Sequence, residues 1–137
     1  MNHPNKVALF WLATAIGVVL SATLHLFFYV NEFVRVRGAT PALTFDTGTL
    51  WVVSAFYGLW IATVLLALIG TRRTDWITLV AGSLLVALST LGGIADGLRD
   101  GWHVTFAAIL FITLPGAFAV AVTWRHIAGK GVTHVHE

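Results

Sequence analysis

The chain has 137 residues, of which 58% are hydrophobic and 10% charged, and its formal net charge at pH 7 is +2. Soluble domains carry about 25% charged residues, and a soluble chain of this length has no interior large enough to bury so much apolar surface. The lack of cysteine excludes structural disulfides, thiolate metal sites and thiol redox chemistry, and the small net charge does not favour nucleic-acid binding. We therefore expect an integral membrane protein whose main partner is the lipid bilayer.

Four apolar runs follow one another along the chain, and none contains Lys, Arg, Asp or Glu. Each is close to the ~20 residues that a helix needs to cross a ~30 Å hydrocarbon core. The first run is too long for a cleaved signal peptide, and no A-x-A-like site follows it. We predict an all-α, polytopic membrane protein with one domain over residues 1–137, an up-down antiparallel four-helix bundle, an outward link at 32–48 and a flexible tail at 125–137. The predicted helices are 7–31, 49–70, 76–95 and 103–124.

The basic residues predict the orientation of this bundle, because cytoplasmic loops carry an excess of Lys and Arg. One side would hold Lys6, Arg72, Arg73, Arg125 and Lys130, and the other Arg35, Arg37 and Arg99. This bias places both termini in the cytoplasm and predicts a multi-pass protein of the inner membrane. Tryptophan is typical of membrane interfaces. We expect an inner belt of Trp11, Trp76 and Trp124 and an outer belt of Trp51 and Trp102.

Two connections leave alternatives open. The segment EFVRVR, which starts at Glu32, either extends the first helix past the bilayer or lies along the interface. The segment GGIADGLRDG at 92–101 is either an outward turn or the end of the third helix. In the helical case, Gly93, Gly97 and Gly101 form a G-x-x-x-G-x-x-x-G ladder that permits close helix approach.

The first helix carries a polar stripe of Thr14, Ser21, His25 and Glu32, at spacings that place them on one helical face. Tyr29 follows His25 by four residues, on nearly the same face. Polar side chains within lipid usually face protein, water or a ligand. The stripe predicts either a hydrogen-bonding seam between helices or a functional histidine near the outer surface.

The 92–103 region supplies possible partners for that histidine. If the third helix continues, Ser89, Asp96, Asp100 and His103 share one face. Two histidines and two or three carboxylates suit zinc, iron or manganese, and copper would also accept the imidazoles. We therefore consider a metal set of His25, His103, Glu32, Asp96 and Asp100, or a haem with His25 and His103 as axial ligands. Buried ionisable groups also suit a proton relay or an acid/base pair. The alternative is an outward loop in which Arg99 neutralises one acid.

Other residues suggest a second ligand-lining region and a polar tail. Pro115 removes one backbone donor in the fourth helix and predicts a kink, which would open a cavity near Trp60. With Tyr57 and Tyr29, Trp60 is a candidate for cofactor or ligand binding. His126, His134 and His136 are interpreted as part of the frayed C-terminal tail.

Three functions from different classes follow from the sequence. The first is a His/carboxylate site near the outer surface that binds a transition metal or haem for redox or hydrolytic chemistry. The second is a non-catalytic accessory or assembly subunit of a larger membrane complex. The third is a homo-oligomeric small-molecule transporter.

Overall fold

The computed structural model describes residues 3–37 and 46–132, and these are helical except at Asp46, Gly70, Thr71 and Gly101. Four helices are long and apolar enough to cross a membrane, as the sequence predicted. The last of them contains a π-helical turn, η1, between α4 and α5. The elements are α1 (His3–Arg37), α2 (Thr47–Ile69), α3 (Arg72–Asp100), α4 (Trp102–Ala108), η1 (Ile109–Thr113) and α5 (Leu114–Val132).

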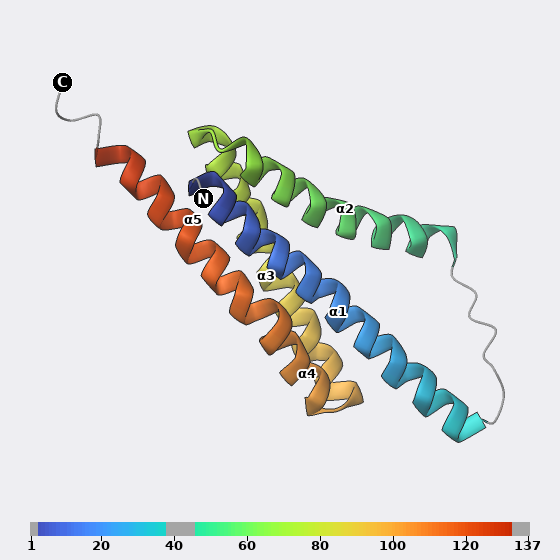
Figure 1. Cartoon of the computed structure of the whole chain (residues 1–137). Helices are drawn as coiled ribbons and strands as arrows, with labels where there is room; N and C mark the ends of the chain where they lie inside the picture. Colours follow the sequence, from blue (N-terminus) through green and yellow to red (C-terminus); the bar gives the residue numbers. More distant parts are fainter. Residues whose placement is uncertain (1–2, 38–45, 133–137) are drawn as a thin grey trace.

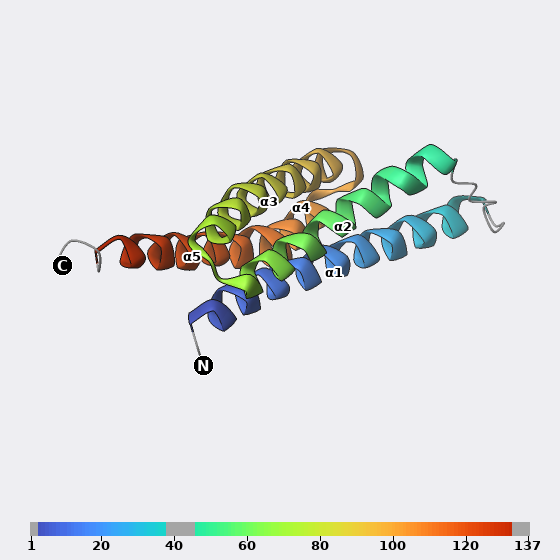
Figure 2. The ribbon, with the colours of Figure 1, turned by 90° about the horizontal axis from the view of Figure 1, so that it is seen from above.

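The helices pack side by side in a bundle (Figure 1). Helix α1 contacts α2 on one side and α4, η1 and α5 on the other, while α3 contacts α2 and the same segments. Helices α1 and α3 therefore lie at opposite corners, as the view from above also shows (Figure 2). The first turns of α1 and the last turns of α5 lie at the end of the bundle where α2 connects to α3 (Figure 1).

Helix starts and ends follow ordinary capping chemistry. Asp46 caps α2 by accepting a hydrogen bond from the backbone N–H of Thr49 at 2.8 Å. The backbone and hydroxyl hydrogen bonds from Thr49 hold the pKa of the Asp46 carboxyl below its ordinary value. Helix α2 ends at Gly70 in the left-handed conformation, and Thr71 and Thr74 form a reciprocal capping box that starts α3. The α2–α3 connection is consequently very short.

Helix α3 runs through the 92–100 segment, so the alternative of an outward loop there is wrong. A Cβ on Gly93 would collide with Ala108, and one on Gly97 would collide with Thr105. The Thr105 hydroxyl donates a hydrogen bond to the carbonyl of Gly93 at 3.2 Å. The glycine ladder is thus the surface on which α4 packs closely against α3.

The irregular turn η1 accommodates Pro115. Proline has no N–H to donate to the carbonyl four residues earlier, which is that of Phe111. That carbonyl lies against Gly17 of α1, where even a methyl group would collide with it. The predicted irregularity therefore coincides with a close crossing of α1 and η1, and it takes the form of a single π-helical turn within a longer helix.

The core lies where α1, α2, α3 and α5 meet. Several of its polar groups form hydrogen bonds within one helix or between two helices. The indole N–H of Trp11 donates to the hydroxyl of Thr123 at 3.0 Å, and Thr123 donates back to the carbonyl of Ala119. Trp11 is completely buried and covers Gly82, so its predicted place in an interface belt is wrong. The main buried apolar residues are Val7, Ala8, Trp11, Val18, Trp60, Ala67, Leu85, Ala108, Ile112 and Ala119.

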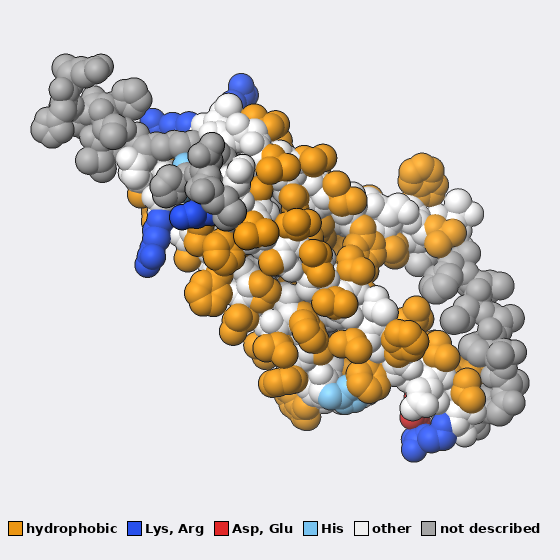
Figure 3. All heavy atoms as spheres, viewed as in Figure 1, with side chains coloured by type: hydrophobic (Ala, Val, Ile, Leu, Met, Phe, Trp, Pro, Cys, Tyr) orange, Lys and Arg blue, Asp and Glu red, His pale blue; other side chains and the backbone are white. Residues whose placement is uncertain are grey.

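Apolar side chains cover most of the visible surface, and basic side chains gather toward its ends (Figure 3). Trp76 and Trp124 are both exposed and contact each other edge to face, with 5.9 Å between their ring centroids. Trp51 and Trp102 are also exposed. A surface of this kind is suited to lipid rather than water.

Both end helices are longer than predicted. Helix α1 continues to Arg37, which confirms the interpretation of EFVRVR as a helical extension, and α5 continues to Val132 instead of ending at Trp124. His126 therefore lies on a helix and not in a frayed tail. His134 and His136 lie outside the described residues.

Candidate functional site

The centre of the candidate site is His25 of α1, which faces two carboxylates of α3. Its Nε2 lies 3.0 Å from Oδ2 of Asp100, within hydrogen-bond distance, and its Nδ1 lies 3.7 Å from Oδ2 of Asp96. Asp96 and Asp100 are four residues apart and share a face of α3, as the helical alternative predicted. The ion pairs among the described residues join both aspartates to His25 and neither of them to Arg99.

The two ring nitrogens of His25 thus have different acceptors. A protonated imidazole has two N–H donors, one for each carboxylate, whereas the neutral ring has only one. The His25 side chain is 31% exposed and those of Asp96 and Asp100 are each 41% exposed, so these groups are partly withdrawn from water. Such a group is suited to holding and exchanging a proton.

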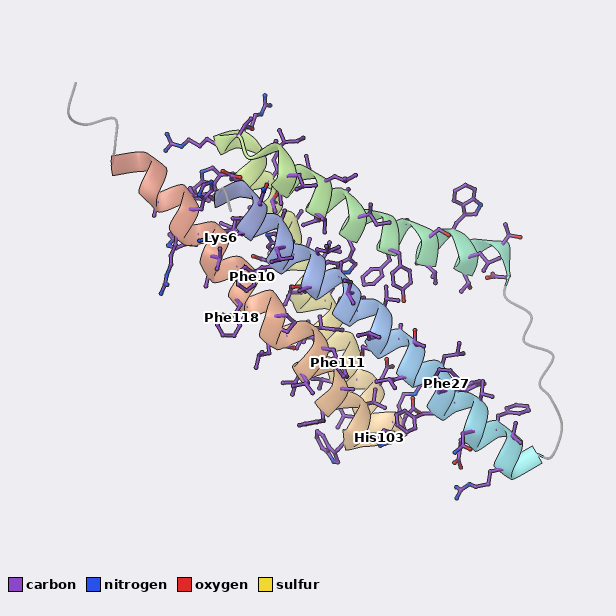
Figure 4. The ribbon with its side chains drawn as sticks, viewed as in Figure 1. Lys6, Phe10, Phe27, His103, Phe111 and Phe118 are labelled. Atoms are coloured by element: carbon purple, nitrogen blue, oxygen red, sulfur yellow. The ribbon has the colours of Figure 1, made fainter. Side chains whose placement is uncertain are left out.

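A pocket of about 680 Å³ lies beside His25 at the end of α1, within the size range of small-molecule sites. His103 stands at the start of α4, at the end of the bundle nearest the last turns of α1 (Figure 4). Its ring contacts Phe28 edge to face, with 4.5 Å between the ring centroids. The pocket is lined by His25, Phe28, Tyr29, Asn31, Glu32, Phe33, Arg99, Asp100 and His103.

A second, smaller cavity of about 200 Å³ adjoins His25 and extends toward the middle of the bundle. Asp96 lines this cavity, whereas Asp100 lines the larger pocket. The hydroxyl oxygen of Ser89, which also lines the smaller cavity, is buried and has no hydrogen-bond partner in the described part of the chain. His25 is the residue that lines both spaces.

The structure brings together only part of the predicted metal set. His25, Asp96 and Asp100 are in contact, but Glu32 bonds to Arg35 at 2.8 Å. His103 leaves the face of Asp96 and Asp100, because α3 ends at Asp100 and Gly101 turns the chain with φ of 116°. Within residues 3–37 and 46–132, no three His, Asp or Glu side chains are grouped so that they could hold a metal ion.

The three residues considered for cofactor binding lie in different places. Tyr29 lines the larger pocket, and Tyr57 lines the smaller cavity with its ring 5.6 Å from that of Phe56. Trp60 is 2% exposed and belongs to the hydrophobic core. These side chains therefore do not form one common binding surface.

Sequence reasoning missed a buried ionisable pair at the opposite end of the bundle. Oδ2 of Asp75 lies 3.5 Å from Nε2 of His126, and the two side chains are 1% and 12% exposed. Asp75 lies close in sequence to Arg72 and Arg73, a charged context that is typical of an exposed segment. The burial of Asp75 could have been predicted from its position on the helix. Asp75 lies three and seven residues before the buried Thr78 and Gly82, so the three residues share one face of α3.

Comparisons with known proteins add no family assignment. The chain matches no protein-family model, no curated protein and no solved structure.

Proposed function

We propose that this chain is a multi-pass protein of the inner membrane, with an up-down bundle, both termini in the cytoplasm and the His25 site near the outer surface. The four apolar helices support membrane insertion. The excess of basic residues near the α2–α3 turn and the chain ends supports this orientation. In this orientation the larger pocket opens near the outer interface.

We further propose that the pocket binds a small amphipathic cation and that His25 releases a proton when this cation binds. The observation that carries this proposal is the placement of one imidazole between two carboxylates beside a pocket of about 680 Å³. Asp96 and Asp100 bring two negative charges, and a single imidazolium balances one of them. A bound cation would take over the contact with Asp100, and the imidazolium of His25 would release one proton to water.

The lining of the pocket supports the same ligand class. Phe28, Tyr29 and Phe33 supply aromatic faces, which attract cations through their ring quadrupoles. Arg99 also lines the pocket and offsets part of the negative charge, so we expect a monovalent ligand. Because the surrounding surface is apolar, such a molecule can arrive either from the lipid or from the outer aqueous phase.

Tetraphenylphosphonium, a monovalent aromatic cation, is a suitable probe. We expect calorimetry on the purified protein to show binding that weakens about tenfold in Asp100→Asn, which corresponds to about 1.4 kcal/mol. Repeating the titration in buffers of different ionisation enthalpy should show proton release that is lost in His25→Ala. Asp46→Asn, which replaces a carboxylate that does not line the pocket, should bind like the parent protein. Equal binding by all variants would refute the proposal.

The same site is the place for the metal or haem considered from the sequence. Binding of the metal would require His103 and Glu32 to leave their present contacts with Phe28 and Arg35, and binding of haem would require His103 to leave its contact with Phe28. Elemental analysis and an absorption spectrum of the untagged protein decide between the two proposals. Near-stoichiometric metal or a Soret band, lost in both His25→Ala and His103→Ala, would favour the cofactor over the cation.

One observation favours a second function, that of an accessory subunit or self-associating protein. The first part of α2, residues 47–55, is exposed throughout, and Figure 3 shows an open gap between the beginning of α2 and the end of α1. A helix of another subunit or of a second copy could pack there. Co-purification of a stoichiometric partner, with unchanged behaviour of His25→Ala, would favour this function.

A further inference from the structure

The smaller cavity next to His25 differs from the hydrophobic core because several polar residues line it beside the apolar ones. The polar residues of this lining are Ser21, His25, Tyr57, Ser89 and Asp96. The hydroxyl of Ser89 is buried without a hydrogen-bond partner in the described chain. Buried polar groups of this kind are usually satisfied by ordered water.

The size of the cavity fits this interpretation. A volume of about 200 Å³ corresponds to about six water molecules at the ~30 Å³ that each occupies in the liquid. Ser89 lies eleven residues before Asp100 on α3, which is about 16 Å at 1.5 Å per helical residue. Water at Ser89 would therefore lie deep within the apolar span.

We propose that this cavity is a water site and that the imidazole of His25 connects it to the outer pocket. Nε2 faces Asp100, which lines the pocket, and Nδ1 faces Asp96, which lines the cavity. A proton that arrives at Nε2 converts the neutral ring into imidazolium, and the proton on Nδ1 then leaves to Asp96 or to water. One proton enters and one departs, so the step is balanced without any further reactant.

This inference extends the proposed function and rests on the same His25 site. It gives the proton released from His25 a destination on the inner side of the ring. Water accessibility and cation binding are separate measurements. A dry cavity would overturn the inference and leave the binding of tetraphenylphosphonium intact, whereas loss of cation binding in the parent protein would leave a wet cavity intact.

Single cysteines offer a direct test because the chain has none of its own. Ser89→Cys replaces a side chain in the cavity, and Leu88→Cys is a matched control at the same depth on the lipid-exposed face. The probe is 2-aminoethyl methanethiosulfonate, added to the protein in liposomes. Thiols react as thiolates, which form in water and not in lipid. We expect Ser89→Cys to react about tenfold faster or more than Leu88→Cys.

The role of His25 is tested in the same background. Adding His25→Ala to Ser89→Cys removes the ring between pocket and cavity, and we expect the labelling rate to rise severalfold. Equal rates for Ser89→Cys and Leu88→Cys would show that the cavity is dry, and an unchanged rate in the double variant would show that His25 is not the connection. If Ser89→Cys fails to fold, Ser21→Cys with its exposed neighbour Leu20→Cys provides the same comparison on α1.

Discussion

Asp75 is buried although the sequence around it is charged. It follows two arginines in a short turn, yet its side chain is buried beside His126. A carboxylate leaves water at a large cost unless other groups compensate for the lost hydration. This position is formed where the start of α3 meets the end of α5.

We predict that Asp75→Ala lowers the free energy of unfolding by about 3 kcal/mol, because it leaves a buried imidazole without its carboxylate. Thermal or denaturant unfolding in detergent measures this change. Glu32→Ala is the matched control, since it also breaks an acid–base pair, but one that is exposed and formed within one helix turn. We expect no measurable loss from Glu32→Ala. A similar response of the two variants would show that the Asp75–His126 contact does not stabilise the bundle.

At the scale of elements, the crossing of α1 with η1 is set by Gly17. The Phe111 carbonyl freed by Pro115 lies where a Cβ on Gly17 would be. Gly17→Ala should therefore separate the two helices and lower the unfolding midpoint by several degrees, as expected for a destabilisation of ~1–3 kcal/mol from overpacking. Gly58→Ala, where the added methyl meets open space, should be neutral or stabilising because alanine favours helix. Equal midpoints for the two variants would contradict this crossing.

The start of α2 should depend on pH through Asp46. Its folded pKa is lowered by hydrogen bonds from Thr49, so its contribution is complete above the ordinary pKa and is lost as pH falls through the lowered value. We expect faster amide exchange in the first turn of α2 under acid conditions, measured by hydrogen–deuterium exchange. Asp46→Asn, which keeps a capping side chain that cannot titrate, should remove the pH dependence. Persistence of the dependence in that variant would exclude Asp46 as its source.

Helix number and approximate position were predictable, because the four apolar runs are long and separated by polar segments. The end of α3 was not predictable from its composition. Dense glycine favours a turn in an isolated segment, whereas here Gly93 and Gly97 fit against Ala108 and Thr105 of α4. Tertiary packing therefore decided between the two alternatives left open by the sequence.

At the scale of the whole molecule, the arrangement of α1 and α3 places His25 near Asp96 and Asp100, as the sequence predicted. It did not bring in His103 or Glu32 as partners of the same imidazole. The reason is local: Gly101 ends the shared helical face, and Arg35 lies one turn from Glu32 and binds it. A helical pattern predicts which residues share a face, but it does not predict where a turn redirects the chain.

The orientation of the bundle in the membrane is the last prediction, and it determines which solution reaches the His25 pocket. Arg73→Cys and Trp102→Cys introduce thiols at exposed positions of the α2–α3 and α4 ends, on opposite sides of the proposed membrane span. With both termini in the cytoplasm, a membrane-impermeant maleimide should label Trp102→Cys in intact spheroplasts, and Arg73→Cys only after permeabilisation. The physical reason is the excess of basic residues on the Arg73 side, which resists translocation. The reverse pattern would place the pocket at the cytoplasmic surface, where any cation that binds it would come from inside the cell.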